Sequence, residues 1–264
     1  MDNLCIIVMT CDKYSDLWTN NLQLFDKYWN DRPNTHLVSD KPNDLINSFN
    51  CFFHNFNGDF SFRLLNILNK VENEYIFLTL DDYLLHDFVN TKVITDLVNE
   101  MTEKKISYIR LFKRKKIHGG WLNSKMRIHL LPLKSETYEV NLYPSIWRRI
   151  DLINLIKSDE NIWKFEVRLT RRCREKKYVC GWINNKKCFR FVDTIRKGKY
   201  LRKAYRFLKK ENLYVSERPV RTIGETIKLN IRTVISRFSP DFIKKKLKRL
   251  TRKEYFSDYA NNDD

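Results

Sequence analysis

The stretch that decides the fold is YIFLTLDDYLL, residues 75–85, in which two adjacent carboxylates interrupt an almost continuous apolar run. The six residues before the carboxylates have the length of one strand, and their side chains are apolar on both faces of it. A strand of this kind is typical of a sheet that helices cover on both sides. Residues 75–80 therefore predict a central strand, and Asp81 and Asp82 mark where the chain leaves the core.

The sequence before this stretch alternates between strand and helix patterns. Residues 4–10 form an apolar run of strand length, and large apolar residues then recur at helical spacing over residues 14–29. Short strands are predicted at 36–39 and 51–53, and a helix at 61–71. The order strand, helix, strand, strand, helix, strand indicates an α/β fold.

The alternation continues after residue 85. The elements predicted there are a helix at 89–103, strands at 108–112, 127–133 and 138–142, helices at 145–157 and 161–174, and strands at 178–183 and 189–192. A helical tail follows from residue 199. We expect two parts, an α/β domain over 1–198 and the tail over 199–264.

Most of the positive charge lies in the tail. The formal net charge is +18. Residues 196–254 hold twenty Lys and Arg against five acids, which gives +15 and leaves only +3 for the rest of the chain. A charge of this size suggests an anionic membrane surface or a nucleic acid as a partner.

Two amphipathic helices are expected in the tail. Residues 220–238 carry apolar side chains at steps of three and four, and residues 239–253 place apolar positions opposite a run of lysines. A basic amphipathic helix can lie in the headgroup layer of an anionic membrane. Alternatively, the apolar faces pack on the α/β domain and the lysines only solvate the outside.

The sequence carries no sign of secretion or of a membrane span. The apolar run at residues 4–9 has acids on both sides, unlike a signal peptide, and no run of about eighteen apolar residues occurs. The six cysteines include no Cys-x-x-Cys pair, so neither a zinc site nor a disulfide framework is indicated. We expect a cytoplasmic protein that is held peripherally at the inner face of the cell membrane.

The acidic pair is the first candidate for chemistry. In open α/β sheets ligands bind beyond the carboxyl ends of the strands, which is where Asp81 and Asp82 stand. Two carboxylates there can hold Mg²⁺ or Mn²⁺ against a diphosphate, whereas the alternative is that they only cap a turn. Neither a Gly-x-Gly-x-x-Gly motif nor a P-loop occurs, so a usual dinucleotide fold or a P-loop NTPase is not supported.

Other strand ends supply further polar residues. Thr10 and Asp12 follow the first predicted strand, and Asp40 ends the second, so these three side chains are candidates for a nucleoside pocket. Arg63 opens the helix before the acidic strand and can contact a diphosphate, or it can simply be solvated.

The ordered segments of residues 4–215 resemble bacterial GT-A-type glycosyltransferases of capsule and lipopolysaccharide gene clusters. The segments that carry the resemblance are MTCDKYSDLW (9–18), LVSD (37–40), SFRLLNILNK (61–70), FLTLDDYLL (77–85), NLYPSIWRR (141–149) and IWKFEVRLTRR (162–172). The resemblance implies a GT-A-like mixed sheet flanked by helices, with a donor half near 1–112 and an acceptor half near 113–198. It also implies a nucleotide-sugar donor, with a UDP-sugar favoured, and a metal-binding acidic motif. Asp81 and Asp82 match that motif as Asp-Asp in place of Asp-x-Asp, which leaves open which carboxylate touches the metal.

The resemblance also implies a catalytic base on the acceptor side. In inverting GT-A enzymes a carboxylate on a helix takes the proton of the attacking hydroxyl, and Glu166 is similar to that base. The alternative is a surface ion pair between Glu166 and a following arginine.

The resemblance implies an inverting glycosyltransferase, and two alternative functions remain open. The predicted function is transfer of a sugar from a nucleotide sugar to a saccharide or lipid-linked acceptor in bacterial surface polysaccharide synthesis. A metal-dependent nucleotidyl- or phosphotransferase can use the same two carboxylates. A nucleic-acid-binding protein is the other alternative, but the charge is confined to the tail and no nucleic-acid motif occurs.

Overall fold

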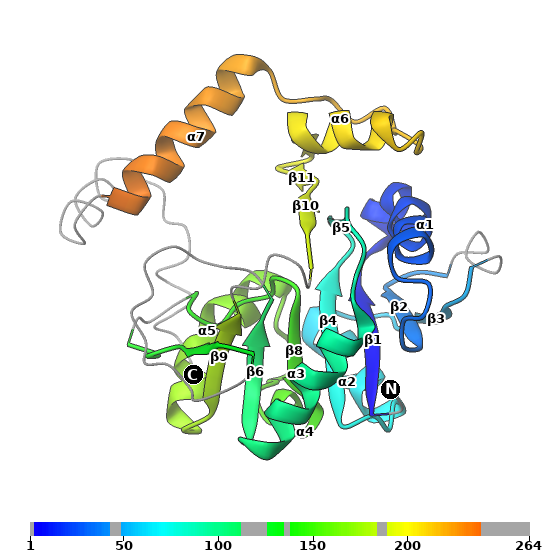
Figure 1. Ribbon diagram of the computed structural model, residues 1–264. Coiled ribbons are helices and arrows are strands. Elements are labelled where there is room, and N and C mark those ends of the chain that lie inside the picture. The colour runs from blue at the N-terminus through cyan, green and yellow to red at the C-terminus, as the bar shows by residue number, and fades with distance from the viewer. Residues whose placement is uncertain (1–2, 43–48, 112–125, 135–137, 184–188, 239–264) are drawn as a thin grey trace. The chain divides into compact units, whose positions relative to one another are not determined.

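A computed structural model describes residues 3–42, 49–111, 126–134, 138–183 and 189–238 (Figure 1). The chain divides into two compact units, Met1–Val192 and Asp193–Asp264. The sequence places the domain boundary after residue 198, and that boundary stays a prediction.

Within the described residues, the first unit is built on an eight-stranded mixed sheet. The strands in spatial order are β3 (Phe52–Asn55), β2 (Thr35–Ser39), β1 (Leu4–Met9), β4 (Tyr75–Leu80), β8 (Ser145–Arg148), β6 (Ile106–Arg110), β9 (Val179–Ile183) and β7 (Ile128–Leu130). Strands β1 to β4 pair in parallel, β8 runs antiparallel between β4 and β6, β9 is parallel to β6, and β7 is antiparallel to β9. A small separate sheet pairs β5 (Tyr83–Leu85) with β10 (Phe191–Asp193).

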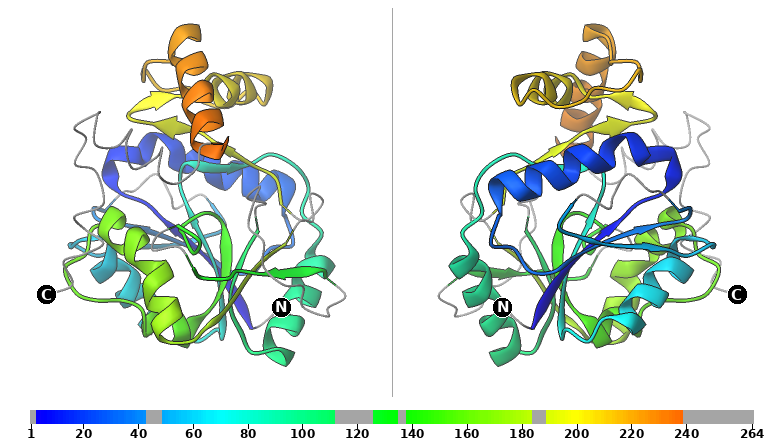
Figure 2. Two further views of the ribbon diagram at one scale, coloured as in Figure 1. Left: turned by 90° about the vertical axis from the view of Figure 1, so that its left-hand side faces the viewer. Right: turned by 90° about the vertical axis from the view of Figure 1, so that its right-hand side faces the viewer.

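Helices cover both faces of the large sheet, as Figure 2 shows with α2 and α5 on one side and α3 on the other. The helical elements are η1 (Asp12–Leu17), α1 (Trp18–Tyr28), α2 (Phe60–Lys70), α3 (Thr91–Glu103), α4 (Arg149–Ile153) and α5 (Ile162–Glu175). Alternate residues of β1 enter opposite cores: Ile6 packs in the cluster that holds the apolar faces of α1 and α3, and Ile7 in the cluster of α2, α4 and α5.

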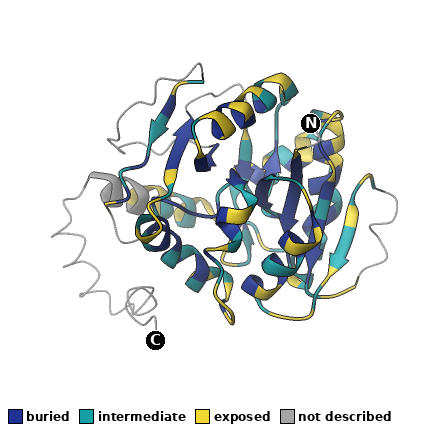
Figure 3. Ribbon diagram, turned by 90° about the horizontal axis from the view of Figure 1, so that it is seen from below, coloured by how far each residue is buried: buried dark blue, intermediate teal, exposed yellow. Residues whose placement is uncertain are grey.

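All six residues of β1 and the first five of β4 are buried, which confirms the central strand predicted at residues 75–80. Figure 3 shows them in the colour of buried residues, while the exposed residues lie along the outer sides of the helices and in the loops. The predicted α/β class and the mixed sheet flanked by helices are therefore confirmed.

The prediction of a helix over residues 145–157 is wrong for its first part. Residues Ser145–Arg148 form the strand β8, and only the five residues of α4 are helical after it. Ile146 and Trp147 are fully buried in opposite cores, so the segment gains more from filling a gap between two strands than from one helical turn. Helix propensity is a weak prior that tertiary packing overrides in this way.

The predicted strand at residues 138–142 is also wrong, because this segment is irregular. A side chain of α5, and not a neighbouring strand, forms the hydrogen bonds of its backbone N–H groups. The Thr170 hydroxyl accepts hydrogen bonds from the backbone N–H groups of Glu139 and Val140 (3.0 and 3.1 Å). Buried backbone groups must find partners, and here a helix supplies them.

The second unit begins with a hairpin and continues with two helices. Strands β11 (Ile195–Arg196) and β12 (Lys199–Tyr200) pair antiparallel, and Lys197 and Gly198 between them both have positive φ. Two such residues are what a type I′ hairpin turn requires. Helices α6 (Arg202–Lys210) and α7 (Ile223–Phe238) follow, and α7 coincides with the amphipathic helix expected at residues 220–238.

The second tail helix, expected at residues 239–253, lies outside the described residues. Among the helices that the structure describes, none combines the length and apolar character that a membrane span requires.

Candidate active site

The strand register brings the polar strand ends to one edge of the sheet. Met9 of β1 pairs with Val38 of β2 and with Leu80 of β4, so these three parallel strands end side by side. β8 begins at the same edge, because its first residue, Ser145, pairs with Leu78. The residues that follow β1, β2 and β4 and precede β8 therefore converge.

Thr10 is the centre of a polar cluster at this edge and is only 6% exposed. Its hydroxyl donates to the carboxylate of Asp81 and accepts from the indole N–H of Trp18 (2.5 Å). Its backbone carbonyl accepts from the guanidinium of Arg63. Three of the predicted site residues, Thr10, Arg63 and Asp81, are thus brought into direct contact.

Asp81 is held inside the structure by its backbone as well as its side chain. It is 6% exposed, its N–H donates to the Met9 carbonyl (3.4 Å), and its own carbonyl accepts from the Asn21 side chain (3.2 Å). Asp82, the next residue, is half-buried. The two carboxylates are therefore not equivalent: Asp81 anchors the end of β4 to β1 and α1.

Asp12 and Asp40 form a second contact at the same edge. The Asp12 backbone N–H donates to Asp40 Oδ1 (2.6 Å), and the Ser39 hydroxyl reaches the same oxygen (3.3 Å). The Lys41 ammonium pairs with Asp12 Oδ2 at 3.1 Å. The loop after β1 is thus fastened to the loop after β2 through a carboxylate.

Cys11 joins this site, although sequence reasoning did not select it. Burial raises the pKa of its thiol, and the nearby carboxylates of Asp81 and Asp40 raise it further. The thiol is therefore protonated at neutral pH and is a poor nucleophile. The only available signal was its position between Thr10 and Asp12.

Glu166 projects from the second turn of α5, whose first turn is capped by Asn161. It is half-buried, and its Oε1 accepts the backbone N–H of Leu142 (3.1 Å). Burial raises the pKa of Tyr138 to about 12, with the negative charge of Glu166 as a further cause. The carboxylate therefore faces the irregular segment that leads into β8.

Arginines after Glu166 pair with other acids. Arg168 and Arg172 both bind the buried Glu160, at 2.6 and 2.7 Å, and Arg171 lies 3.7 Å from Glu175. Burial alone would raise the pKa of Glu160, but the two guanidinium groups outweigh it and hold that pKa below its usual value. This triad fixes the start of α5, and Glu166 itself accepts a hydrogen bond from the backbone of Leu142.

Two tyrosines connect the acidic pair with the segment that Glu166 holds. Tyr83 follows Asp82, Tyr143 follows Leu142, and their ring centroids lie 5.2 Å apart. This ring contact links the residues that follow the acidic pair with the segment that precedes β8.

Asp81 and Asp82 can provide part of a metal site. Their carboxylate oxygens are the hard ligands that Mg²⁺ and Mn²⁺ prefer. One oxygen of Asp81 already accepts the Thr10 hydroxyl, and in the described ranges no three His, Cys, Asp or Glu residues gather into a metal site. The pair can therefore contribute two carboxylates to a cation whose other ligands include the oxygens of a phosphorylated ligand.

Comparisons with known proteins were made by family model, by sequence and by structure. No protein-family model and no curated protein matches the chain. The similar solved structures include S. aureus TarS 1-349 in complex with UDP-GlcNAc, with 15% identity, a TM-score of 0.46, and coverage of 81% of this chain and 62% of that one. The mannosyltransferase PcManGT from Pyrobaculum calidifontis, in complex with GDP-Man and Mn²⁺, has 11% identity, a TM-score of 0.49 and coverage of 74% and 58%.

A third similar structure, the bifunctional IspDF from Campylobacter jejuni, has 11% identity and a TM-score of 0.44, and covers 72% of this chain and 52% of that one. This chain spans less than two thirds of the length of each of the three. With TM-scores below 0.5, these matches do not identify what the chain does. The functional argument therefore rests on the chain's own site.

Proposed function

We propose that the protein is a GT-A-type glycosyltransferase that uses a nucleotide-sugar donor. The observation that carries this proposal is the convergence of Thr10, Asp40 and the acidic pair at the carboxyl edge of a mixed sheet. A second observation supports it: Glu166 of α5 binds the backbone of the segment that precedes β8, and this segment contacts the residues after the acidic pair. The ordered segments that resemble bacterial capsule and lipopolysaccharide glycosyltransferases support the same function.

The donor nucleotide would lie over the ends of β1, β2 and β4. Asp40 and Asp12 hold the loops that would surround the nucleoside, and their carboxylate oxygens are acceptors suited to its hydroxyl and N–H groups. Arg63 donates a hydrogen bond to the carbonyl of Thr10, and its guanidinium would supply positive charge to the diphosphate of the donor. A UDP-sugar is the donor that we favour.

A divalent cation, Mg²⁺ or Mn²⁺, would be held by Asp82 with support from Asp81. When bound, such a cation offsets the charge that develops on a departing nucleoside diphosphate. The protein itself would orient the two carboxylates. Thr10 holds the side chain of Asp81, and the hydrogen bond of the Asp81 backbone to Met9 fixes the turn that carries Asp82.

Glu166 would remove the proton from the attacking acceptor hydroxyl, which makes the transfer inverting. Its half-buried position beside Tyr138 and Leu142 gives it the partly apolar surroundings that a general base needs. The acceptor that we propose is a saccharide or a lipid-linked saccharide of bacterial surface polysaccharide synthesis. We also propose that the enzyme acts in the cytoplasm, at the inner face of the membrane.

The test is a thermal-shift screen of UDP-, GDP- and CMP-sugars with and without Mn²⁺, on the unmodified protein and on Asp82→Asn. We expect at least one nucleotide sugar to raise the melting temperature, with an increase that depends on Mn²⁺ and is lost in Asp82→Asn. Failure of every nucleotide sugar to bind, together with binding of free nucleoside triphosphates, would favour a nucleotidyltransferase instead.

A further inference from the structure

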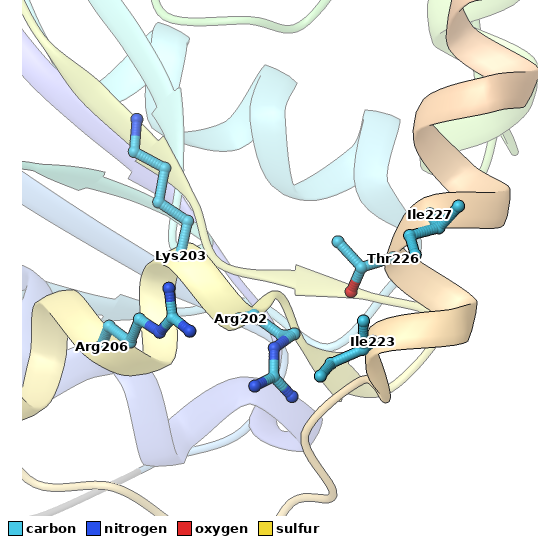
Figure 4. Close-up of a pocket in the computed structure, with 6 residues that line it drawn as sticks. All are labelled: Arg202, Lys203, Arg206, Ile223, Thr226 and Ile227. Atoms are coloured by element: carbon cyan, nitrogen blue, oxygen red, sulfur yellow. The ribbon is translucent and has the colours of Figure 1, made fainter.

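The second unit contains a groove with one cationic wall and one largely apolar wall. Its lining residues are Arg202, Lys203 and Arg206 of α6 and Ile223, Thr226 and Ile227 of α7. Figure 4 shows these side chains on the two helices, with Arg202 reaching from α6 toward Ile223. Nothing in the proposed donor site uses this groove.

The start of α7 is fixed within its unit, so the groove is a built feature. Thr222 and Glu225 form a capping box, in which each backbone N–H donates to the other side chain (2.9 and 3.1 Å). Lys199 of the hairpin pairs with Glu225 at 2.7 Å. Arg202 also donates to the carbonyl of Arg221 (3.4 Å), which ties the cationic helix to the same corner.

The apolar wall continues along α7 as an exposed ridge. Ile223, Ile227 and Ile231 follow one another at four-residue spacing and are 62%, 52% and 53% exposed. Large apolar side chains aligned on one exposed face mark a surface that interacts with an apolar partner. Solubility would favour polar residues at all three positions.

The neighbouring helix is strongly cationic. Alongside Arg202, Lys203 and Arg206, it carries Lys209 and Lys210 in its last turn. Glu225, the acid nearest the groove wall in sequence, is neutralised by Lys199. The surface therefore offers unbalanced positive charge directly beside an apolar ridge.

A bilayer with anionic lipids matches both properties at once. Its phosphate groups meet the cations, and the boundary of its acyl chains receives the isoleucines. A nucleic-acid backbone or a free phosphate would use the cations and leave the isoleucines in water. Charge complementarity together with the apolar ridge selects a membrane surface.

We propose that α6 and residues 223–231 of α7 form a docking surface for an anionic bilayer, with Arg202, Lys203 and Arg206 on the headgroups and Ile223, Ile227 and Ile231 at the acyl boundary. This inference does not rest on the glycosyltransferase function. If both hold, the surface places the enzyme beside a lipid-linked acceptor.

The test is co-sedimentation of the full-length protein with phosphatidylcholine vesicles that contain or lack phosphatidylglycerol. The triple variant Arg202→Gln, Lys203→Gln, Arg206→Gln should bind the anionic vesicles roughly a hundredfold more weakly, about fivefold per cation near a membrane surface. A charge-matched control, Lys92→Gln, Lys157→Gln, Lys176→Gln, removes three exposed cations from the first unit. It should change binding by less than about threefold, because these cations are not part of the docking surface.

A second pair of variants tests the apolar ridge. Ile223→Ser with Ile227→Ser should weaken vesicle binding at least tenfold, whereas Ile150→Ser, at a site 49% exposed on α4, should not. Circular dichroism should be unchanged in all variants, because the substituted side chains lie at the surface. If the α6 variant and the control variant lost vesicle affinity equally, binding would depend only on the net charge of the protein, and the proposal would be overturned.

Three further results would also overturn it. Full vesicle binding by the isoleucine variant would show that the groove is only an anion-binding site. Displacement of the unmodified protein from vesicles by millimolar inorganic phosphate would show the same. Full binding by both groove variants would place any membrane contact elsewhere in the chain. Because no nucleotide sugar enters these assays, their outcome is separate from that of the donor screen.

Discussion

At the scale of single residues, Thr10 organises the candidate site. The sequence suggested only that it lines a nucleoside pocket, but its hydroxyl and carbonyl join three elements: Trp18 of α1, Arg63 of α2 and Asp81 after β4. A residue used in this way determines how its neighbours are presented to a ligand. The shape of the site therefore depends on a side chain that is itself almost fully buried.

Replacing Thr10 with Val should destabilise the protein and disturb the acidic pair. The substitution keeps the shape but leaves the Trp18 N–H and one Asp81 oxygen without the hydroxyl, which we expect to lower the free energy of unfolding by about 1–3 kcal/mol. Urea unfolding measures the loss. Thr10→Ser retains the hydroxyl and should lose less than half as much, and equal losses in the two variants would show that the methyl group matters instead.

Replacing Glu166 with Gln should separate chemistry from folding. The amide oxygen can still accept the Leu142 N–H, so the loop should hold, while the lost base should lower the transfer rate about 10²–10⁴-fold. Steady-state rates and donor affinity are the measurements, and donor affinity should not change. Retained turnover in this variant would remove Glu166 from the mechanism.

At the scale of elements, β8 decides how the two halves of the sheet join. It pairs with β4 on one side and β6 on the other, so the short strand Ser145–Arg148 carries the connection between the acidic pair and the rest of the sheet. The same strand brings Leu142 and Tyr143 to the carboxyl edge. A helix at this position would have put the acceptor side elsewhere.

The strand assignment predicts a contrast between two isoleucines four residues apart. Ile146→Ala should cost about 2–5 kcal/mol of unfolding free energy, because Ile146 is fully buried in the core, whereas Ile150→Ala should cost under about 1 kcal/mol at its half-exposed position. Urea unfolding of both variants measures this. Similar costs at the two sites would contradict the buried strand.

The edge of the sheet at β3 contains a titrating pair. His36 Nδ1 lies 3.0 Å from His54 Nε2, and the Lys70 ammonium approaches the other nitrogen of His54 (3.4 Å). Burial, followed by the positive charges of His54 and Lys70, lowers the pKa of His36 to about 4. His36 therefore stays neutral in the native state at pH values where the same side chain in the unfolded chain, with a pKa near 6.5, binds a proton.

This pair should make the protein less stable in mild acid. As the pH falls from 6.5 toward 4, the unfolded chain binds a proton that native His36 does not, so the free energy of unfolding decreases; above pH 6.5 the group has no effect. Urea midpoints at pH 7.5 and 5.0 measure the slope. His36→Gln should show a smaller drop over the same interval, and an unchanged slope would assign the acid sensitivity to other groups.

At the scale of the whole molecule, the two proposed binding regions fall in different compact units. The candidate donor site lies in Met1–Val192, and the groove of α6 and α7 lies in Asp193–Asp264. The concentration of positive charge in the tail follows the same division. We therefore expect a nucleotide sugar and a membrane to bind different parts of the chain.

Hydrogen exchange should reveal this division directly. A bound nucleotide sugar should slow exchange in the loops after β1, β2 and β4, while anionic vesicles should slow it in α6 and α7, because each ligand stabilises only what it contacts. Mass spectrometry of peptides from both regions is the measurement. Protection of α6 by the nucleotide sugar alone would contradict separate binding regions.

The sequence by itself determined the α/β class, the central strand at residues 75–80 and the carboxyl-edge position of the acidic pair, because buried strands and helix faces leave local periodic patterns. It also located the amphipathic α7. Only the tertiary structure decided that residues 145–148 form a strand and that Asp81 binds Thr10, because both depend on neighbours far away along the chain. For the same reason the sequence did not reveal the role of Cys11 or the groove of α6 and α7. Each depends on contacts between side chains that are distant in the sequence, and local spacing does not predict such contacts.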